Sequence, residues 1–237
     1  MILQLAVQGK LVPQDENDES ASVLLGRIKA EREKFVAAGL AKKQKDLLPV
    51  NDAPHTIPRN WVWVRLGEVQ DFVNGFAFKS QEYTDQGIGI VRIGDIQNGE
   101  IDTSGMKYVP KDYLDALDVR LRVVKGDLVI AMSGATTGKL GFNQSDEMYL
   151  LNQRVEKIIL LLIDPQFACY YLKTKIQENL RISAGSAIPN LSTEQINNIA
   201  FPLPPPRRTK AHRHQSRPTH DPMRPTRSQA QPDPTTQ

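Results

Sequence analysis

Cysteine is almost absent from this chain of 237 residues, and long apolar runs are missing altogether. A single cysteine, Cys169, excludes an internal disulfide framework and a zinc site built from cysteines. The longest apolar run, 158–163, is far shorter than the roughly 18 residues that a membrane-spanning helix needs. The first residues also lack the basic and apolar regions of a secretory signal peptide. The sequence therefore predicts a protein of the reducing cytoplasm.

Familiar catalytic motifs are missing too. There is no Asn/Asp-Pro-Pro-aromatic motif of amino-methyl transfer, no glycine-rich S-adenosylmethionine loop after a strand, and no nuclease cluster of carboxylates with a lysine. Residues 134–139 (GATTGK) resemble a phosphate-binding loop, but only three residues separate the glycines, and Leu140 stands where that loop needs Ser or Thr. We therefore predict no catalytic residue and no cofactor. A tight turn that offers its N–H groups to phosphates or base edges fits 134–139 better.

Metal binding is not predicted either. His212, His214 and His220 could be read as a metal-binding tract, but the segment lacks the cysteine or carboxylate geometry of a metal site. Cys169 lies beside Ala168 and Tyr170 in an amphipathic segment with no histidine nearby, which is typical of a packed thiol.

Charge is distributed unevenly along the chain. The formal net charge is +3, but residues 204–237 hold seven basic and two acidic residues, which leaves the remaining body at −2. If this body binds nucleic acid, its basic side chains must gather on one face, or a partner must supply much of the affinity for phosphates.

The sequence divides into four segments. Residues 1–46 read as the end of one helix followed by a second helix from about 20 to 45, with Leu24, Leu25, Ile28 and Phe35 as its apolar stripe. The second helix is either a solvated surface helix or an arm that packs on another helix or another chain. Residues 47–57 form a proline-containing linker, and 58–205 form the compact domain. Residues 206–237 hold no large aliphatic or aromatic side chain except Met223, so this basic, proline-rich tail is expected to be disordered.

The compact domain has an α+β pattern. Strand-like runs are 61–69, two short segments within 87–96, a hairpin-like pair within 121–132 around Lys125-Gly126-Asp127, and 155–163. Residues 166–182 predict an amphipathic helix that buries Phe167, Tyr171, Leu172, Ile176 and Leu180. Ser192 and Gln195 predict a capping box at the start of a short last helix.

Five segments in order resemble the specificity subunit of type I restriction–modification enzymes. They are 2–14 (ILQLAVQGKLVPQ), 28–31 with the entry 58–67 (PRNWVWVRLG), 91–102 (VRIGDIQNGEID), 126–142 (GDLVIAMSGATTGKLGF) with 150–155 (LLNQRV), and 185–205 (GSAIPNLSTEQINNIAFPLPP). Each segment is weak evidence alone, but five in family order cover nearly all of residues 1–205.

The resemblance implies a non-catalytic DNA-recognition subunit. A full subunit would have two target-recognition domains separated by two long antiparallel helices, and each domain would read half of a split site in double-stranded DNA. Methyltransferase subunits and the restriction subunit would dock on it and carry out the chemistry. On this view 58–205 is one mixed α/β target-recognition domain and 1–46 is the remnant of the conserved helical region.

The chain departs from the family pattern at both ends. The first recognition domain is missing, so a truncated subunit is expected. After Pro206 the chain reads Arg-Arg-Thr-Lys instead of the start of the closing helix, although a shift of one nucleotide would allow an amphipathic helix there. We interpret the tail as the product of such a frameshift, and the alternative is a genuine basic tail that binds phosphates. Sequencing the gene tests this.

Three alternatives stay open for the whole protein. The first is an inert gene remnant that folds without assembling, the second a half-length subunit that dimerises on a palindromic split site, and the third a self-contained methyltransferase or nuclease. The absent motifs disfavour the last of these.

DNA-contact residues are expected in the family-like segments and in the aromatic turn 74–78. Arg92 has an ion pair as its alternative role, and Asn152 and Arg154 can simply tie loops together. In this family the bases read vary widely, so recurring motifs can also be scaffold. The predicted DNA-binding residues are Lys79, Arg92, Ser133, Thr136, Thr137, Lys139, Asn152 and Arg154.

Overall fold

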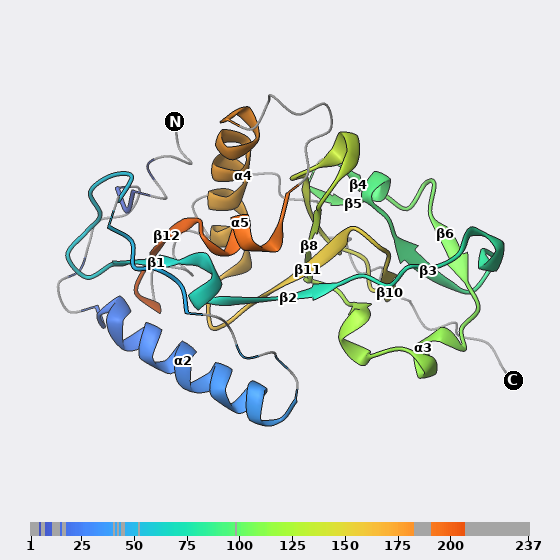
Figure 1. Ribbon diagram of the computed structural model, residues 1–237, viewed down its shortest axis with the longest axis horizontal. Coiled ribbons are helices and arrows are strands. Elements are labelled where there is room, and N and C mark those ends of the chain that lie inside the picture. The colour runs from blue at the N-terminus through green and yellow to red at the C-terminus, as the bar shows by residue number, and fades with distance from the viewer. Residues whose placement is uncertain are drawn as a thin grey trace, which may run out of the picture.

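The computed structural model describes residues 18–39, 46–51, 53–97, 99–182 and 191–206, with residues 5, 8–10, 15, 41 and 43 (Figure 1). Its helices are α2 (Ala21–Ala37), α3 (Tyr113–Ala116), α4 (Pro165–Ile182) and α5 (Thr193–Asn197). Its strands are β1 (Val62–Arg65), β2 (Gln70–Asn74), β3 (Ile88–Val91), β4 (Ile96–Gln97), β5 (Glu100–Ile101), β6 (Lys107–Val109), β7 (Arg122–Val123), β8 (Leu128–Ala131), β9 (Leu140–Phe142), β10 (Tyr149–Leu151), β11 (Val155–Leu160) and β12 (Ala200–Leu203). The predicted α+β fold is confirmed. None of the described helices is long and apolar enough to cross a bilayer.

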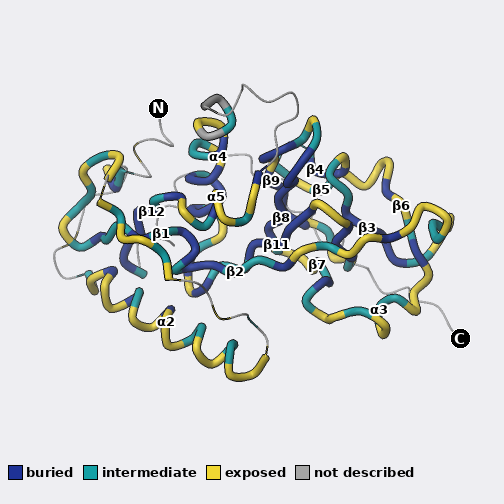
Figure 2. The backbone as a smooth tube through the Cα atoms, in the orientation of Figure 1, coloured by how far each residue is buried: buried dark blue, intermediate teal, exposed yellow. Residues whose placement is uncertain are grey.

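Two sheets and a two-stranded ribbon organise the domain. The larger sheet has the order β2-β11-β8-β9-β5-β4, the smaller β6-β3-β10-β7, and β1 pairs with β12. Side chains of β8 alternate between two cores: Leu128 and Ile130 face one, while Val129 and Ala131 face the other. Because both faces of β8 are covered, this strand and β11 form the buried centre of the molecule (Figure 2).

Helices α2, α4 and α5 lie toward one end of the molecule. In Figure 1, α2, α4 and α5 surround the β1–β12 ribbon, while β3, β6 and α3 lie at the opposite end, with β2, β8 and β11 between them. The stripe of α2 buries Ala21, Leu24 and Ile28 in the first core, with Leu25 and Phe35 packed against it. The apolar stripe therefore packs on this chain's own domain, and its charged face remains exposed.

Helix α2 is shorter than the sequence predicted. It ends at Ala37 instead of near residue 45. Gly39 adopts a left-handed φ of 70°, and its N–H donates to the carbonyl of Val36 at 3.1 Å. A glycine in this conformation commonly stops a helix, so Gly39 was the stop signal. Residues 40, 42, 44 and 45 lie outside the described part of the chain, as does most of the helix end predicted within 1–12.

The predicted hairpin within 121–132 is wrong. Strand β7 pairs with β10 in the smaller sheet, whereas β8 pairs with β9 and β11 in the larger one. The turn between them has Gly126 at φ 91°, with its N–H bonded to the carbonyl of Asn143 at 2.8 Å. This turn leads the chain from one sheet into the other, so that both strands find partners distant in sequence.

The C-terminal part of the domain closes the fold. The capping box is confirmed: the Ser192 hydroxyl accepts from the N–H of Gln195 at 3.1 Å, and the Gln195 side chain accepts from the N–H of Ser192 at 2.8 Å. The helix 166–182 is confirmed as α4, with four of its five predicted residues buried and Leu180 partly so. The sequence missed β12, because Pro202 lies within it; a proline is tolerated here since β12 pairs on one side only. The tail 207–237, with its predicted disorder and frameshift, lies outside the described residues.

Candidate nucleic-acid interface

Four loops meet where strands β2, β3, β8 and β10 end. We call them the strand-end turns: residues 75–87, 92–95, 132–139 and 152–154. Backbone hydrogen bonds join them: the N–H of Asn152 donates to Val91, that of Phe76 to Leu151, and that of Met132 to Arg154, at 2.9–3.0 Å. All eight predicted DNA-binding residues lie in these turns, so the fold brings together positions that are up to 75 residues apart in sequence.

The turn 132–139 is a compact, internally bonded loop. Its Thr136 hydroxyl donates to the carbonyl of Ile93 at 2.8 Å, and the Thr137 hydroxyl donates to that of Gly134 at 2.7 Å. Lys139 is exposed, and its Nζ donates to Oε1 of Gln97 at 2.8 Å. Both hydroxyls therefore stabilise the turn, and Lys139 presents the charge of this segment.

Gly138 explains how this turn sits on the domain. It has a φ of 80°, and a Cβ at this position would lie 2.4 Å from Cγ2 of Ile176 on α4. Only glycine avoids both the left-handed penalty and this overlap. Gly138 therefore allows the turn to pack closely on α4.

Ser133 begins this turn but lies below the surface. It is 8% exposed, and its Oγ has no hydrogen-bond partner among the residues the structure describes. Beside it, the carbonyl of Met132 accepts from the N–H of Leu191 at 2.9 Å.

Arg92 is committed to an ion pair. Its Nε and Nη2 donate to the two carboxylate oxygens of Asp95 at 3.1 and 2.9 Å, and Nη2 also donates to the carbonyl of Gly105 at 2.7 Å. Asp95 is 5% exposed and also accepts from the backbone N–H of Arg92. The guanidinium therefore holds the turn 92–95 in shape and ties it to residue 105.

The turn 152–154 presents one arginine outward. Asn152 is 8% exposed, and its Nδ2 lies 3.5 Å from the hydroxyl of Tyr83, at the limit for a hydrogen bond. Arg154 is exposed and has a φ of 67°. A non-glycine residue in this region is uncommon and is a frequent feature of functional sites.

Lys79 lies at the far end of the strand-end turns. It is exposed, and its backbone N–H donates to the carboxylate of Glu82 at 3.0 Å. This bond, together with one from Tyr113, lowers the pKa of Glu82. The eight predicted residues thus divide into three exposed cations and five groups bonded or buried within the turns.

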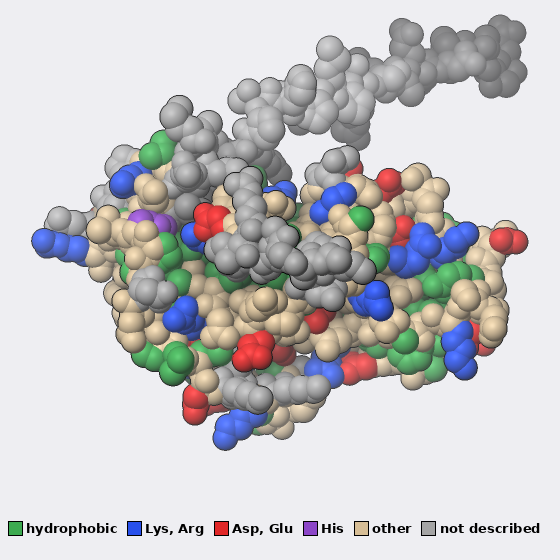
Figure 3. All heavy atoms as spheres, turned by 45° about the horizontal axis from the view of Figure 1, so that its top comes forward, with side chains coloured by type: hydrophobic (Ala, Val, Ile, Leu, Met, Phe, Trp, Pro, Cys, Tyr) green, Lys and Arg blue, Asp and Glu red, His purple; other side chains and the backbone are tan. Residues whose placement is uncertain are grey.

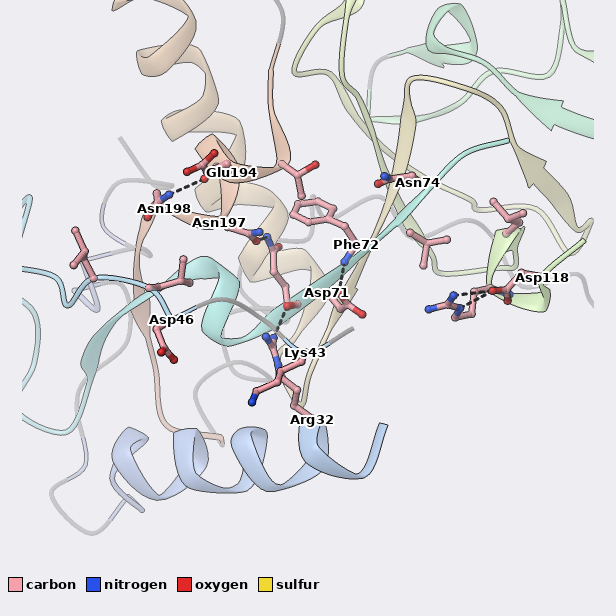
Figure 4. Close-up of a pocket in the computed structure, with 17 residues that line it drawn as sticks. Arg32, Lys43, Asp46, Asp71, Phe72, Asn74, Asp118, Glu194, Asn197 and Asn198 are labelled. Carbon is pink, nitrogen blue, oxygen red and sulfur yellow. Dashed lines mark hydrogen bonds and ion pairs between the residues drawn. The ribbon is translucent and has the colours of Figure 1, made fainter. Parts of the chain in front are cut away.

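A separate cleft opens between α2, β2, α5 and residues 118–121 (Figure 4). Its volume is about 700 Å³. Carboxylates outnumber cations on its walls: Asp46, Asp71, Asp118 and Glu194 face Arg32, Lys43 and Arg120. Arg120 is already paired with Asp118 at 2.7 Å, and Arg32 donates to the backbone carbonyl of Gln70. This cleft is therefore a poor phosphate site and lies apart from the exposed cations of the strand-end turns.

Chemistry-bearing groups elsewhere are few in the described residues. Cys169 is 1% exposed, and burial raises the pKa of its thiol to about 11, which confirms a packed thiol. No group of three or more His, Cys, Asp or Glu side chains suited to a metal occurs among the described residues. His212, His214 and His220 lie outside them. On the face drawn in Figure 3, Lys and Arg side chains are interspersed with Asp and Glu, in keeping with the near-neutral body.

Comparison with known proteins identifies the family of this chain. Residues 58–212, well over half of the chain, match the model of the type I restriction modification DNA specificity domain. The chain belongs to this family. The resemblance found in the sequence is thereby confirmed, and members of the family are non-catalytic DNA-recognition subunits.

Relatives of known name agree with this assignment. The type I restriction enzyme EcoAI specificity subunit of Escherichia coli is 37% identical over 213 residues, which cover 86% of this chain and 36% of that protein. The HsdS subunit from Thermoanaerobacter tengcongensis shares the fold, with a TM-score of 0.50, 14% identity, and coverage of 82% of this chain and 47% of that one. A structure from work on assembly of the type I R-M system gives a TM-score of 0.53, 18% identity and the same coverages. This chain thus spans less than half of the length of each of these relatives.

Several residues of this specificity domain were missed by sequence reasoning. Phe76 is a large side chain that remains 38% exposed within the strand-end turns, and Gln97 and Tyr83 hold Lys139 and Asn152. The aromatic turn 74–78 was expected to contact DNA, but Phe76 was not among the predicted residues. Gln97 and Tyr83 carry no such signal, because only the pairing of distant strands makes them neighbours.

Proposed function

We propose that this chain recognises a DNA sequence as a type I specificity subunit and directs methyltransferase and restriction subunits to it. Residues 58–205 form the target-recognition domain, 1–46 the helical conserved region and arm, 47–57 the linker and 206–237 the tail. The chain binds double-stranded DNA, and the partner subunits carry out the methylation and cleavage. The chain itself needs no cofactor and no metal, and it acts in the cytoplasm, where these subunits meet DNA.

One observation carries this proposal: the strand-end turns display Lys79, Lys139 and Arg154 at the surface on a rigid, hydrogen-bonded base. Cations of this kind bind phosphates, and in the major groove they also read guanine edges. A rigid base favours binding because the loops are already ordered before DNA binds, so less conformational entropy is lost on binding.

The other five residues support the interface in our proposal. Arg92 holds the turn 92–95 in shape, Thr136 joins that turn to the turn 132–139, and Thr137 closes the second turn. Asn152 bonds the end of β3 through its backbone, and the buried Ser133 hydroxyl has no hydrogen-bond partner among the described residues. We expect direct DNA contact first from the three exposed cations.

The near-neutral body limits affinity. Three cations facing phosphates give a weaker salt dependence than the six to ten contacts of a strong DNA binder. We therefore expect this chain to bind DNA tightly only with a methyltransferase subunit, which adds phosphate contacts of its own. The tail 207–237 adds further positive charge, with seven basic and two acidic residues.

Duplex selection from a random library tests the proposal. The full chain, co-purified with the methyltransferase subunit of its host, is expected to enrich one split motif, and the complex is expected to methylate that motif. Lys139→Ala and Arg154→Ala should each weaken binding about tenfold, as one lost contact of about 1–3 kcal/mol implies. Lys34→Ala and Arg27→Ala on the exposed face of α2 are the matched controls.

Two results would overturn the proposal. One is selection of no motif by the complex. The other is methylation of DNA by the isolated chain with S-adenosylmethionine, which would make it an enzyme in its own right.

A further inference from the structure

Phe76 is fixed by its backbone at the end of the strand-end turns. Its N–H donates to the carbonyl of Leu151 at 2.9 Å, and its carbonyl accepts from the N–H of Gln153 at 2.8 Å. The preceding Gly75 is so close to the turn 152–154 that a Cβ there would lie 1.9 Å from the carbonyl oxygen of Asn152. Phe76 is therefore held on a strand-like framework next to Asn152 and Arg154.

The ring of Phe76 is also held by other rings. Its centroid lies 5.0 Å from that of Phe78 in an edge-to-face arrangement and 6.2 Å from that of Tyr113. Phe78 and Tyr113 contact each other at 5.1 Å, and Phe78 is 8% exposed. Edge-to-face packing of this kind adds roughly 0.5–1.5 kcal/mol per pair beyond simple burial. The cluster thus fixes one orientation of a ring that is still 38% exposed.

The cluster is joined to Lys79. The hydroxyl of Tyr113 is bonded to the carboxylate of Glu82, which raises the pKa of Tyr113 along with burial. The same carboxylate accepts from the N–H of Lys79 at 3.0 Å. An exposed cation and an exposed aromatic edge are therefore placed by one network, three residues apart.

We propose that Phe76 is a specificity-determining residue that contacts the 5-methyl group of a pyrimidine in the major groove. The inference rests on the proposed function, because it takes the strand-end turns as the DNA-contacting surface. The methyl of thymine is the apolar group that base edges offer there, and side chains such as Phe contact it. 5-Methylcytosine offers the same group.

Contact with a methyl fits the geometry better than insertion between bases. A ring that unstacks a base step must project freely, as apolar wedges do. The Phe76 ring has well over half of its surface covered, and insertion would require it to leave Phe78 and Tyr113. Contact through its exposed part requires no rearrangement.

The test uses the duplex selected by the full complex, with each thymine replaced in turn by uracil and each cytosine by 5-methylcytosine. Removal of one methyl at the contacted position should weaken binding by wild type about fourfold, the effect of burying one such group. If the contacted base is a cytosine, 5-methylation there should strengthen binding by about the same factor. Phe76→Ala should lose this discrimination at that position alone, and Phe76→Leu should keep part of it.

Val119→Ala, at another exposed apolar residue, is the control and should leave the pattern unchanged. The inference is overturned if no position responds to methyl removal or addition in wild type, a result that needs no variant to fold. It is also overturned if Phe76→Ala keeps the full response. A complex that selects no motif at all contradicts the proposed function instead, and this inference falls with it.

Discussion

The backbone N–H of Met132 donates a hydrogen bond of 2.9 Å to the carbonyl of Arg154, a residue with a φ of 67°. This bond joins the turn after β8 to the turn after β10. The left-handed conformation of Arg154 turns the chain back into β11 while its guanidinium, exposed, is left without a hydrogen-bond or ion-pair partner among the described residues. A costly backbone conformation and a free cation thus coincide at one position.

Arg154 can be tested by comparing glycine with alanine. Both substitutions remove the cation, so both should weaken DNA binding and reduce the slope of log affinity against log salt by about 1. Glycine should be more stable than alanine by about 1–2 kcal/mol, because only glycine adopts this φ without penalty. Chemical denaturation and anisotropy titrations at several salt concentrations measure the two effects. Wild-type affinity in Arg154→Gly would exclude Arg154 from the interface.

Gly138→Ala should destabilise the domain. Its Cβ would meet Ile176 at 2.4 Å in addition to adopting a φ of 80°. Gly126→Ala is the matched control, since Gly126 has a φ of 91° but open space around its Cβ position. We expect Gly126→Ala to lower the free energy of unfolding by about 1–2 kcal/mol, because alanine is strained at this φ. Gly138→Ala should lower it by about 1–3 kcal/mol more, because its side chain also overlaps Ile176. Equal losses in thermal melts would contradict the packing of 134–139 on α4.

Arg92→Lys separates a structural role from a DNA contact. Lysine cannot reproduce the two forked bonds to Asp95. The buried carboxylate would therefore lose most of the hydrogen bonds that offset the cost of removing its charge from water. We expect the free energy of unfolding to fall by about 2 kcal/mol. This is less than the 3–5 kcal/mol lost when a fully buried ion pair is broken, because the Arg92 side chain is 31% exposed. The affinity for DNA should not change, since the guanidinium is bonded to Asp95 and to the carbonyl of Gly105. A weakened affinity with unchanged stability would instead make Arg92 a DNA contact, because lysine cannot replace a forked arginine contact.

Glu156→Gln should stabilise the protein near neutral pH. Burial raises the pKa of Glu156, whose carboxylate accepts only from the Thr193 hydroxyl among the described contacts, at 3.0 Å. Between the ordinary pKa of about 4.3 and the raised folded value, the folded state binds more protons than the unfolded one. Stability of the wild type therefore falls as pH rises through this window.

The neutral glutamine removes this dependence. Its melting temperature should exceed that of the wild type at pH 7.5 and approach it near pH 3, below both pKa values, where the carboxyl is protonated in both states. If the melting temperature of Glu156→Gln exceeded that of the wild type by the same amount at both pH values, the stabilisation would come from packing and not from charge.

Periodicity and capping chemistry made part of this structure predictable. Helix α4 and the capping box of α5 follow from residues close in sequence, and they agree with the structure because local hydrogen bonds and one apolar face decide them. The prediction for β7 and β8 was wrong because a two-residue strand carries no signal for its partner. Strand pairing is a long-range choice, made by the two sheets that cover each other.

The candidate site divides in the same way. The glycines of 134–139, together with Lys139 and Arg154, mark turns that resemble family segments, and we propose that these turns contact DNA. The hydroxyl of Thr136 donates to the carbonyl of Ile93, 43 residues away, so this contact depends on the fold. Thr137 with Gly134, and Arg92 with Asp95, are pairs only three residues apart, which local turn geometry brings together. The aromatic turn 74–78 was expected at the DNA, but only the structure shows that Phe76 is exposed while Phe78 is buried.

Membership of the family, the α+β class and the exclusion of an internal disulfide follow from the amino-acid sequence alone, because motifs, periodicity and cysteine count can be read from the residues directly. Which loops become neighbours depends on the three-dimensional fold. The ends of β2, β3, β8 and β10 meet because side chains on both faces of β8 and β11 must be buried at once. That packing requirement acts between residues far apart in the chain, and it separates the three exposed cations from the five groups that support them.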